Sequence, residues 1–172
     1  MQKKCFALLF FLIIMTFATT AMAANEDKPD MSAFKDIDRG VLIERAFEVQ
    51  PKSYAPYSHF NVAATVLCDS GKIYTGVNVE NASYPAGICA ERNAIFHAVA
   101  EGERQIRAIV VIGGPNAVVT DYCSPCGICR QVMREFGNPQ KVLVIMAKSP
   151  TDYKEMTLEA LLPLSFGPDS LG

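Results

Sequence analysis

The hydrophobic positions of this 172-residue chain change their spacing several times from about residue 36 onward. Between residues 36 and 50 they recur at helical spacing and Pro51 follows, so this segment is predicted to be a helix that ends there. Residues 60–68 and 72–80 are instead rich in β-branched and apolar side chains. Because Gly71 lies in the short segment between them and tolerates the left-handed conformation, a β-hairpin is predicted.

The second half of the chain alternates helical and extended patterns. Residues 89–101 and 126–136 are predicted helices, and residues 107–112 and 141–146 are predicted strands, the second of which is apolar throughout and so expected to be buried on both faces. A short helix is expected at residues 158–162. Strands that alternate with helices in this way predict an α/β fold, in which a mixed sheet lies between helical layers.

The N-terminal segment has a composition of its own. Lys3 and Lys4 precede an unbroken apolar run from Cys5 to Met15, and Ala21-Met22-Ala23 has the small-residue pattern of a cleavage site. These features predict a secretory signal peptide. The expected organisation is a signal peptide over residues 1–23, a disordered leader over residues 24–35 and one folded domain over residues 36–172.

The predicted signal peptide sets expectations about location and charge. Its apolar run is shorter than the roughly 20 residues that cross a bilayer, so no stable membrane anchor is expected after cleavage. The protein is then expected in the secretory pathway, as a secreted protein; an uncleaved anchor, or an extension without a role in export, is the alternative. Cleavage would remove two lysines and change the formal charge from −2 to −4. An acidic chain without a basic cluster argues against nucleic acid as a partner.

Three cysteines and one glutamate form the candidate chemical centre. Cys89 is followed two residues later by Glu91, and Cys126 and Cys129 form a C-x-x-C pair. The pair alone would suit a redox disulfide, half of a structural zinc site or chance spacing. Together with Cys89 it offers three thiolate ligands, and no fourth ligand stands at the expected spacing. An open zinc position binds a water molecule and lowers its pKa from about 15.7 to roughly 7.

Local geometry favours a single metal site built from both segments. Cys126 and Cys129 are three residues apart, which places them about 60° apart around a helix. Cys89 and Glu91 would lie on nearly opposite sides of an ideal helix, so Cys89 is expected at the very start of its helix. There the free N–H groups stabilise a thiolate. Arg92 is expected to compensate the charge of the three thiolates by donating hydrogen bonds to sulfur.

Five ordered motifs together resemble the small, homotetrameric, zinc-dependent cytidine deaminases. They are YSHF at 57–60, GVNVENASY at 76–84, CAER at 89–92, PCGICRQVMREFG at 125–137 and LLPLSFGP at 161–168. The resemblance implies a three-layer α/β/α cytidine-deaminase-like fold with a mixed sheet of about five strands, and a catalytic domain over residues 36–172. It also implies one Zn²⁺ per subunit, held by Cys89, Cys126 and Cys129. Cysteine in the first ligand position, instead of the histidine of the H-x-E version, points to the tetrameric branch.

The same resemblance implies the reaction. Water activated by zinc would attack C4 of the pyrimidine while Glu91 moves protons, which is general acid/base catalysis. Cytidine and deoxycytidine would become uridine and deoxyuridine with release of ammonia, as in pyrimidine salvage. Taken alone, Glu91 could also be an ordinary acidic residue that favours the N-terminal end of a helix.

The nucleoside pocket is expected from the same family pattern. Asn78 and Glu80 would hydrogen-bond the ribose hydroxyls, and their period-two spacing would put both on one strand face. Tyr84 and Phe166 would reach the site of a neighbouring subunit in a homotetramer with shared active sites. The full set of expected substrate contacts is Phe60, which would pack on the nucleoside, Asn78, Glu80, Asn81, Ala82, Tyr84, Ala90, whose backbone would contact the base edge, and Phe166.

Three other functions stay open at this point. A deaminase of another aminopyrimidine nucleoside, of the blasticidin type, shares the cysteine motifs, although the sequence at residues 78–81 favours ordinary ribonucleosides. A non-catalytic secreted zinc-binding scaffold would gain little from Glu91. A redox protein using Cys126 and Cys129 is the third, and metal content would distinguish it. Cys68 and Cys123 are expected to be free thiols.

Overall fold

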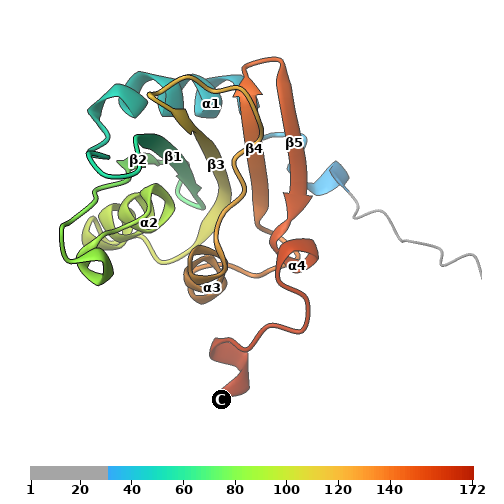
Figure 1. Ribbon diagram of the computed structural model, residues 1–172. Coiled ribbons are helices and arrows are strands. Elements are labelled where there is room, and N and C mark those ends of the chain that lie inside the picture. Colours follow the sequence, from blue (N-terminus) through green and yellow to red (C-terminus); the bar gives the residue numbers. More distant parts are fainter. Residues whose placement is uncertain (1–30) are drawn as a thin grey trace, which may run out of the picture.

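The computed structural model describes residues 31–172 (Figure 1). The predicted signal peptide and residues 24–30 of the predicted leader lie outside this part. Within the described residues no helix is long and apolar enough to span a membrane. Met31–Phe34 forms a short 3₁₀ helix in which Phe34 is buried. The last residues of the predicted leader therefore belong to the folded domain, because Phe34 packs into its core.

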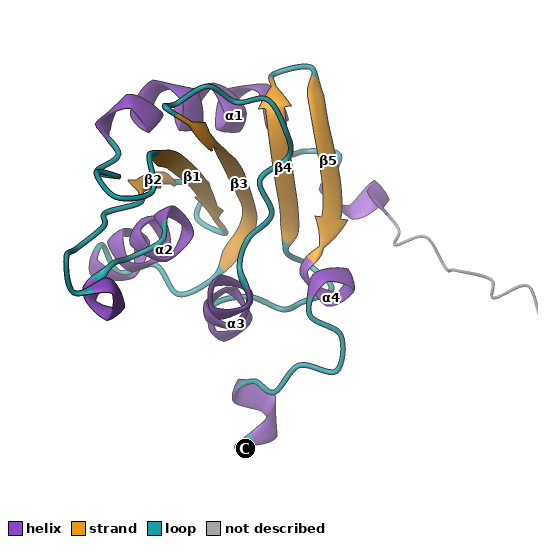
Figure 2. Cartoon of the chain, viewed as in Figure 1, coloured by secondary structure: helices purple, strands orange, loops and turns teal. Residues whose placement is uncertain are grey.

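A five-stranded sheet forms the middle layer of the domain (Figure 2). Its order is β2-β1-β3-β4-β5. The pair of β3 and β4 is parallel and the other neighbouring pairs are antiparallel, which confirms the predicted mixed sheet. The strands are β1 (Phe60–Cys68), β2 (Ile73–Val77), β3 (Ile106–Pro115), β4 (Leu143–Ser149) and β5 (Asp152–Thr157).

Helices cover both faces of the sheet, as predicted for a three-layer fold. Helix α1 (Arg39–Val49) lies on one face, and α2 (Ala90–Ala100) and α3 (Gly127–Glu135) lie on the other (Figure 1). The short helix α4 (Leu158–Leu161) follows β5. This arrangement puts the first turns of α2 and α3 in the same helical layer.

The central strand β3 contributes to both cores. Ile109 and Val111 pack into the cluster beneath α2 and α3, whereas Val110 and Ile112 pack into the cluster beneath α1. Side chains of a strand alternate between the two faces of a sheet, and here both faces are covered. Because both faces of β3 are covered, its residues from Ala108 to Ile112 are all apolar.

One expectation about the strands was wrong, and one strand was not located from the sequence. The second strand of the hairpin ends at Val77 and not at Glu80, because Val79 leaves the β1 ladder and forms isolated bridges with Tyr54 and Ile88. Asn78 and Glu80 therefore lie in a connecting segment and share no strand face. The residue pattern did not locate the fifth strand that the resemblance implies, because this edge strand, β5, reads Asp-Tyr-Lys-Glu-Met-Thr and lacks an apolar run.

Gly76 sets the distance between β2 and α2. A Cβ at this position would lie 2.3 Å from the backbone nitrogen of Ala94 and 2.6 Å from the carbonyl oxygen of Ala90. Replacing Gly76 with alanine is expected to lower the free energy of unfolding by about 2–3 kcal/mol, because a backbone contact cannot move aside easily. Urea unfolding measures the change. Gly40→Ala in α1 is the control, since its nearest atom would be 3.4 Å away; equal stability of the two variants would contradict the prediction.

Candidate metal and active site

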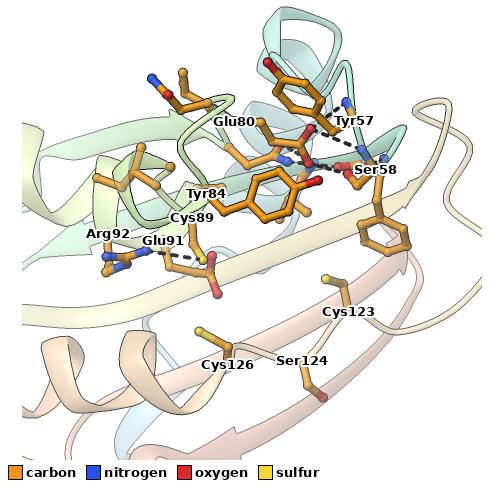
Figure 3. Close-up of a pocket in the computed structure, with 18 residues that line it drawn as sticks. Tyr57, Ser58, Glu80, Tyr84, Cys89, Glu91, Arg92, Cys123, Ser124 and Cys126 are labelled. Carbon is orange, nitrogen blue, oxygen red and sulfur yellow. Dashed lines mark hydrogen bonds between the residues drawn. The ribbon is translucent and has the colours of Figure 1, made fainter.

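Two helix starts bring the three cysteines together. Cys89 is the N-cap of α2 and Cys126 is the N-cap of α3, while Cys129 lies in the first turn of α3. The three sulfur atoms lie within 4.8 Å of one another, and the sulfurs of Cys126 and Cys129 are 3.5 Å apart. The position of Cys89 agrees with the spacing argument, because the N-cap leaves the helical path and lets residue 91 lie beside the same centre (Figure 3).

The donor set fits one zinc ion. Zinc–sulfur bonds of about 2.3 Å in a tetrahedral site put sulfur atoms about 3.8 Å apart, close to the separations seen here. No fourth histidine, cysteine, aspartate or glutamate joins this group in the part of the chain that the structure describes. Three thiolate ligands and an open position are the arrangement of a catalytic zinc site rather than a structural one.

The charges around the sulfur atoms favour a thiolate at Cys89. A hydrogen bond with Cys129 is the main cause that lowers the pKa of Cys89 to about 5, and Arg92 lowers it further. The Arg92 guanidinium donates to the Cys89 sulfur over 3.7 Å, as expected from the sequence. The same pairing raises the pKa of Cys129. One sulfur is therefore ready as an anion before a cation is bound.

Glu91 lies in the first turn of α2 and is 4% exposed. Burial raises the pKa of this carboxyl, and the negative charge of Cys89 adds to the effect. A carboxyl group whose pKa is moved toward neutrality can both take up and release a proton during a reaction. Glu91 also lines the cavity in front of the sulfur atoms.

A cavity of about 640 Å³ opens in front of this centre. One side is formed by the start of α2 and by the segment before α3, which carries Cys123 and Ser124. The other side is formed by residues 57–62 and 78–84 (Figure 3). Ten of the residues expected from the sequence line it: Phe60, Asn78, Glu80, Asn81, Tyr84, Cys89, Ala90, Glu91, Arg92 and Cys126.

Residues 38–146 match the model of the cytidine and deoxycytidylate deaminase zinc-binding region. The chain belongs to this family. The match contains β1 to β3, most of β4 and both helix starts that carry the cysteines.

Individual family members are similar over most of their length. The cytidine deaminase of Halalkalibacterium halodurans is 41% identical over 130 residues, which is 76% of this chain and 95% of the relative. The probable cytidine deaminase of Dictyostelium discoideum is 42% identical over 129 residues, 75% of this chain and 84% of the relative. The crystal structure of cytidine deaminase from Burkholderia pseudomallei superposes with a TM-score of 0.68 at 41% identity and covers 76% of this chain and 100% of that one. The resemblance drawn from the five motifs is thereby confirmed.

Ala82, Phe166 and Cys129 are the three expected residues that do not line the cavity of this chain. Phe166 is 61% exposed on the C-terminal segment. Cys129 is fully buried, and its sulfur lies within 4.8 Å of those of Cys89 and Cys126. Tyr84 lines the cavity of its own chain, and its ring lies 6.1 Å from the ring of Tyr57. That Tyr84 and Phe166 reach the site of a neighbouring subunit stays a prediction.

The side-chain amide of Asn78 forms hydrogen bonds with the backbone of the protein itself. Its amide oxygen accepts from the N–H of Val62 at 2.8 Å, and its amide nitrogen donates to the carbonyl of Phe60 at 2.9 Å. These bonds fix the first residues of β1, and with them the ring of Phe60, beside the cavity. Asn78 thus helps to shape this wall of the cavity.

Eight lining residues are not among those expected from the sequence, and the four of these with polar or sulfur-bearing side chains are Tyr57, Ser58, Cys123 and Ser124. Tyr57 and Ser58 precede Phe60 in the YSHF motif, so their proximity to an expected contact was the available signal. Cys123 and Ser124 precede the C-x-x-C pair, but the sequence alone does not show that this loop borders the cavity. Burial raises the pKa of Cys123 to about 11, which makes this thiol unreactive.

Proposed function

We propose that this chain catalyses the hydrolytic deamination of cytidine and 2′-deoxycytidine, giving uridine or deoxyuridine and ammonia. The observation that carries the proposal is the buried Glu91 carboxyl beside three converging cysteine sulfurs, in a cavity whose volume lies within the range typical of small-ligand sites. Family members of similar length carry the same activity in their names.

The protons of the reaction are assigned to Glu91. Zinc held by Cys89, Cys126 and Cys129, one ion per subunit, would supply the Lewis acid that makes water a nucleophile at neutral pH. Glu91 takes a proton from that water and delivers one to N3 of the pyrimidine, which makes C4 electrophilic. A further proton passes through Glu91 to the departing amine. Its burial supports this role, because the low local polarity keeps both protonation states accessible.

Arg92 is assigned to charge compensation. Three thiolates exceed the charge of one dication, and excess negative charge would weaken the pull of the metal on its water. The guanidinium lies 3.7 Å from the Cys89 sulfur and withdraws part of that charge through a hydrogen bond.

The nucleoside is assigned to the cavity between the metal centre and the opposite wall. Phe60 would pack on the nucleoside, and the backbone of Ala90 would contact the base edge. Glu80 and Asn78 would meet the sugar hydroxyls, with Asn81 beside them. Ala82 does not line the cavity, so a contact with the nucleoside would require movement of the segment that carries it.

We further propose a homotetramer with shared active sites. Phe166 and Leu164 are 61% and 100% exposed, although the segment that carries them is held in place. Gln131 donates to the carbonyl of Phe166 at 3.0 Å, and Arg134 pairs with Asp169 at 2.7 Å. Fixed, exposed apolar side chains are suited to a partner surface. Sedimentation velocity tests this assembly, and a monomer at micromolar concentration would exclude it.

Turnover of nucleosides tests the activity. The full chain with bound zinc is expected to release one ammonia for each cytidine or deoxycytidine consumed at neutral pH. Ammonia release, the change in ultraviolet absorbance and the zinc content are measured on one preparation. A folded, zinc-loaded chain that leaves both nucleosides unchanged would overturn the proposal and favour the non-catalytic scaffold.

Export is proposed from the sequence alone. Cleavage after residue 23 is expected in a secreting host, and N-terminal sequencing of the purified protein tests it. An intact N-terminus would overturn the assignment of a signal peptide.

A further inference from the structure

Glu80 is held by three hydrogen bonds from one short segment. Its carboxylate accepts from the backbone N–H of Tyr57 at 2.9 Å and of Ser58 at 3.2 Å, and also from the hydroxyl of Ser58 (Figure 3). The Ser58 oxygen in turn accepts from the N–H of Phe60 at 3.0 Å. The hydroxyl therefore has one fixed donor and one fixed acceptor, so its direction toward Glu80 is set.

The backbone of this segment is held in an uncommon conformation. His59 has a φ of +54°, which residues other than glycine rarely adopt. Its N–H donates to Ala55 at 3.1 Å, and its carbonyl accepts from Asn116 at 2.7 Å. Such conformations persist only where the surroundings fix them, and they cluster at functional sites. The turn keeps the two N–H groups and the hydroxyl of Ser58 aimed at one carboxylate.

Glu80 retains the capacity to accept another hydrogen bond. An ionised carboxylate offers about four acceptor positions, and three are used by the protein. The hydrogen bond from Ser58 is the main cause that lowers the pKa of Glu80, so the group stays charged at neutral pH. Both residues line the cavity. A fixed, charged acceptor on a cavity wall suits a hydroxyl donor of the ligand.

We propose that Ser58 is a positioning residue that orients the Glu80 carboxylate toward a sugar hydroxyl and so determines how strongly the site discriminates against nucleosides that lack it. The inference rests on the proposed nucleoside deamination. It extends that proposal to Ser58, to which the family resemblance gave no role. Glu80 contacts the substrate; Ser58 acts through Glu80.

Substrate pairs separate this role from a general effect on the loop. In the full chain, Ser58→Ala is expected to lower kcat/KM for cytidine by about five- to tenfold, mainly through KM, because a hydrogen bond to a charged group is lost. For 2′,3′-dideoxycytidine, the expected change in kcat/KM is less than about twofold, since this substrate lacks the 2′- and 3′-hydroxyls that could donate to Glu80. Ser58→Thr keeps a hydroxyl and is expected to restore discrimination. Ser70→Ala, on the exposed turn of the hairpin, is the control.

Each outcome has a distinct meaning. Equal losses on the two substrates, or no rescue by Ser58→Thr, would overturn the inference and leave Ser58 with a structural role. Glu80→Gln is measured in parallel. If Glu80→Gln abolishes discrimination and Ser58→Ala does not alter it, Ser58 does not position the carboxylate and the inference fails. If Glu80→Gln itself leaves discrimination intact, the inference fails together with the assignment of Glu80 to the sugar, while cytidine turnover by the parent still supports the deaminase reaction.

Discussion

Replacing Glu91 with alanine is expected to lower kcat for cytidine by about 10³- to 10⁴-fold, the upper part of the range that general acid/base catalysis contributes, because Glu91 is assigned more than one proton transfer. The bound zinc is expected to stay at one ion per chain, because the three sulfur ligands come from other residues. Activity is expected to fall because Glu80 is the only other carboxyl group of the described residues that lines the cavity, and Tyr57 and Ser58 hold it at the opposite wall. Steady-state kinetics and metal analysis on the same samples measure both quantities.

Two further variants make this result specific. Glu91→Gln keeps the shape of the buried side chain without its titratable proton, so it is expected to be as inactive as alanine. Glu101→Ala removes an exposed carboxyl at the other end of α2 and is expected to keep full activity. If Glu91→Ala lost its zinc as well, the carboxyl would have to be reassigned to holding the metal.

The metal centre could be predicted from the sequence because its geometry is local. The spacing of Cys89 and Glu91 allows both to face one point only if a helix starts between them, and the structure places the start of α2 there. Cys126 and Cys129 likewise depend on a single turn of α3. Only the approach of the two cysteine-bearing helix starts depends on the tertiary fold. The alternating pattern of strands and helices indicated that fold.

The opposite wall could not be predicted in the same way, because long-range contacts build it. Glu80 is fixed by residues 57 and 58, more than 20 positions earlier. Asn78 was expected on a strand face with Glu80, but the strand ends at Val77. Alternation of residue types cannot show where a ladder of hydrogen bonds stops. Strand β5 was missed for a related reason, since its pairing with β4 and not an apolar pattern defines it.

Replacing Cys129 with alanine is expected to reduce bound zinc from one ion per chain to near zero and to abolish turnover. Two sulfur ligands cannot hold zinc as three do, and Cys129 is the buried member of the set. Zinc that binds only the folded chain stabilises it by mass action. The thermal midpoint of the parent is therefore expected to fall when a chelator is added, and that of Cys129→Ala is expected to be low already and to be insensitive to the chelator.

Cys68 provides the matched control, because it is as fully buried as Cys129 and belongs to the same core cluster. Its sulfur is not part of the metal group, and burial raises its pKa to about 11, so it remains a neutral thiol. Cys68→Ala creates a comparable cavity and is expected to lower the midpoint modestly while zinc, activity and the response to chelator persist. If both variants lost stability equally and both kept zinc, Cys129 would be a packing residue. If only Cys129→Ala loses the ion, the difference between the two variants measures how much the metal contributes to the stability of the fold.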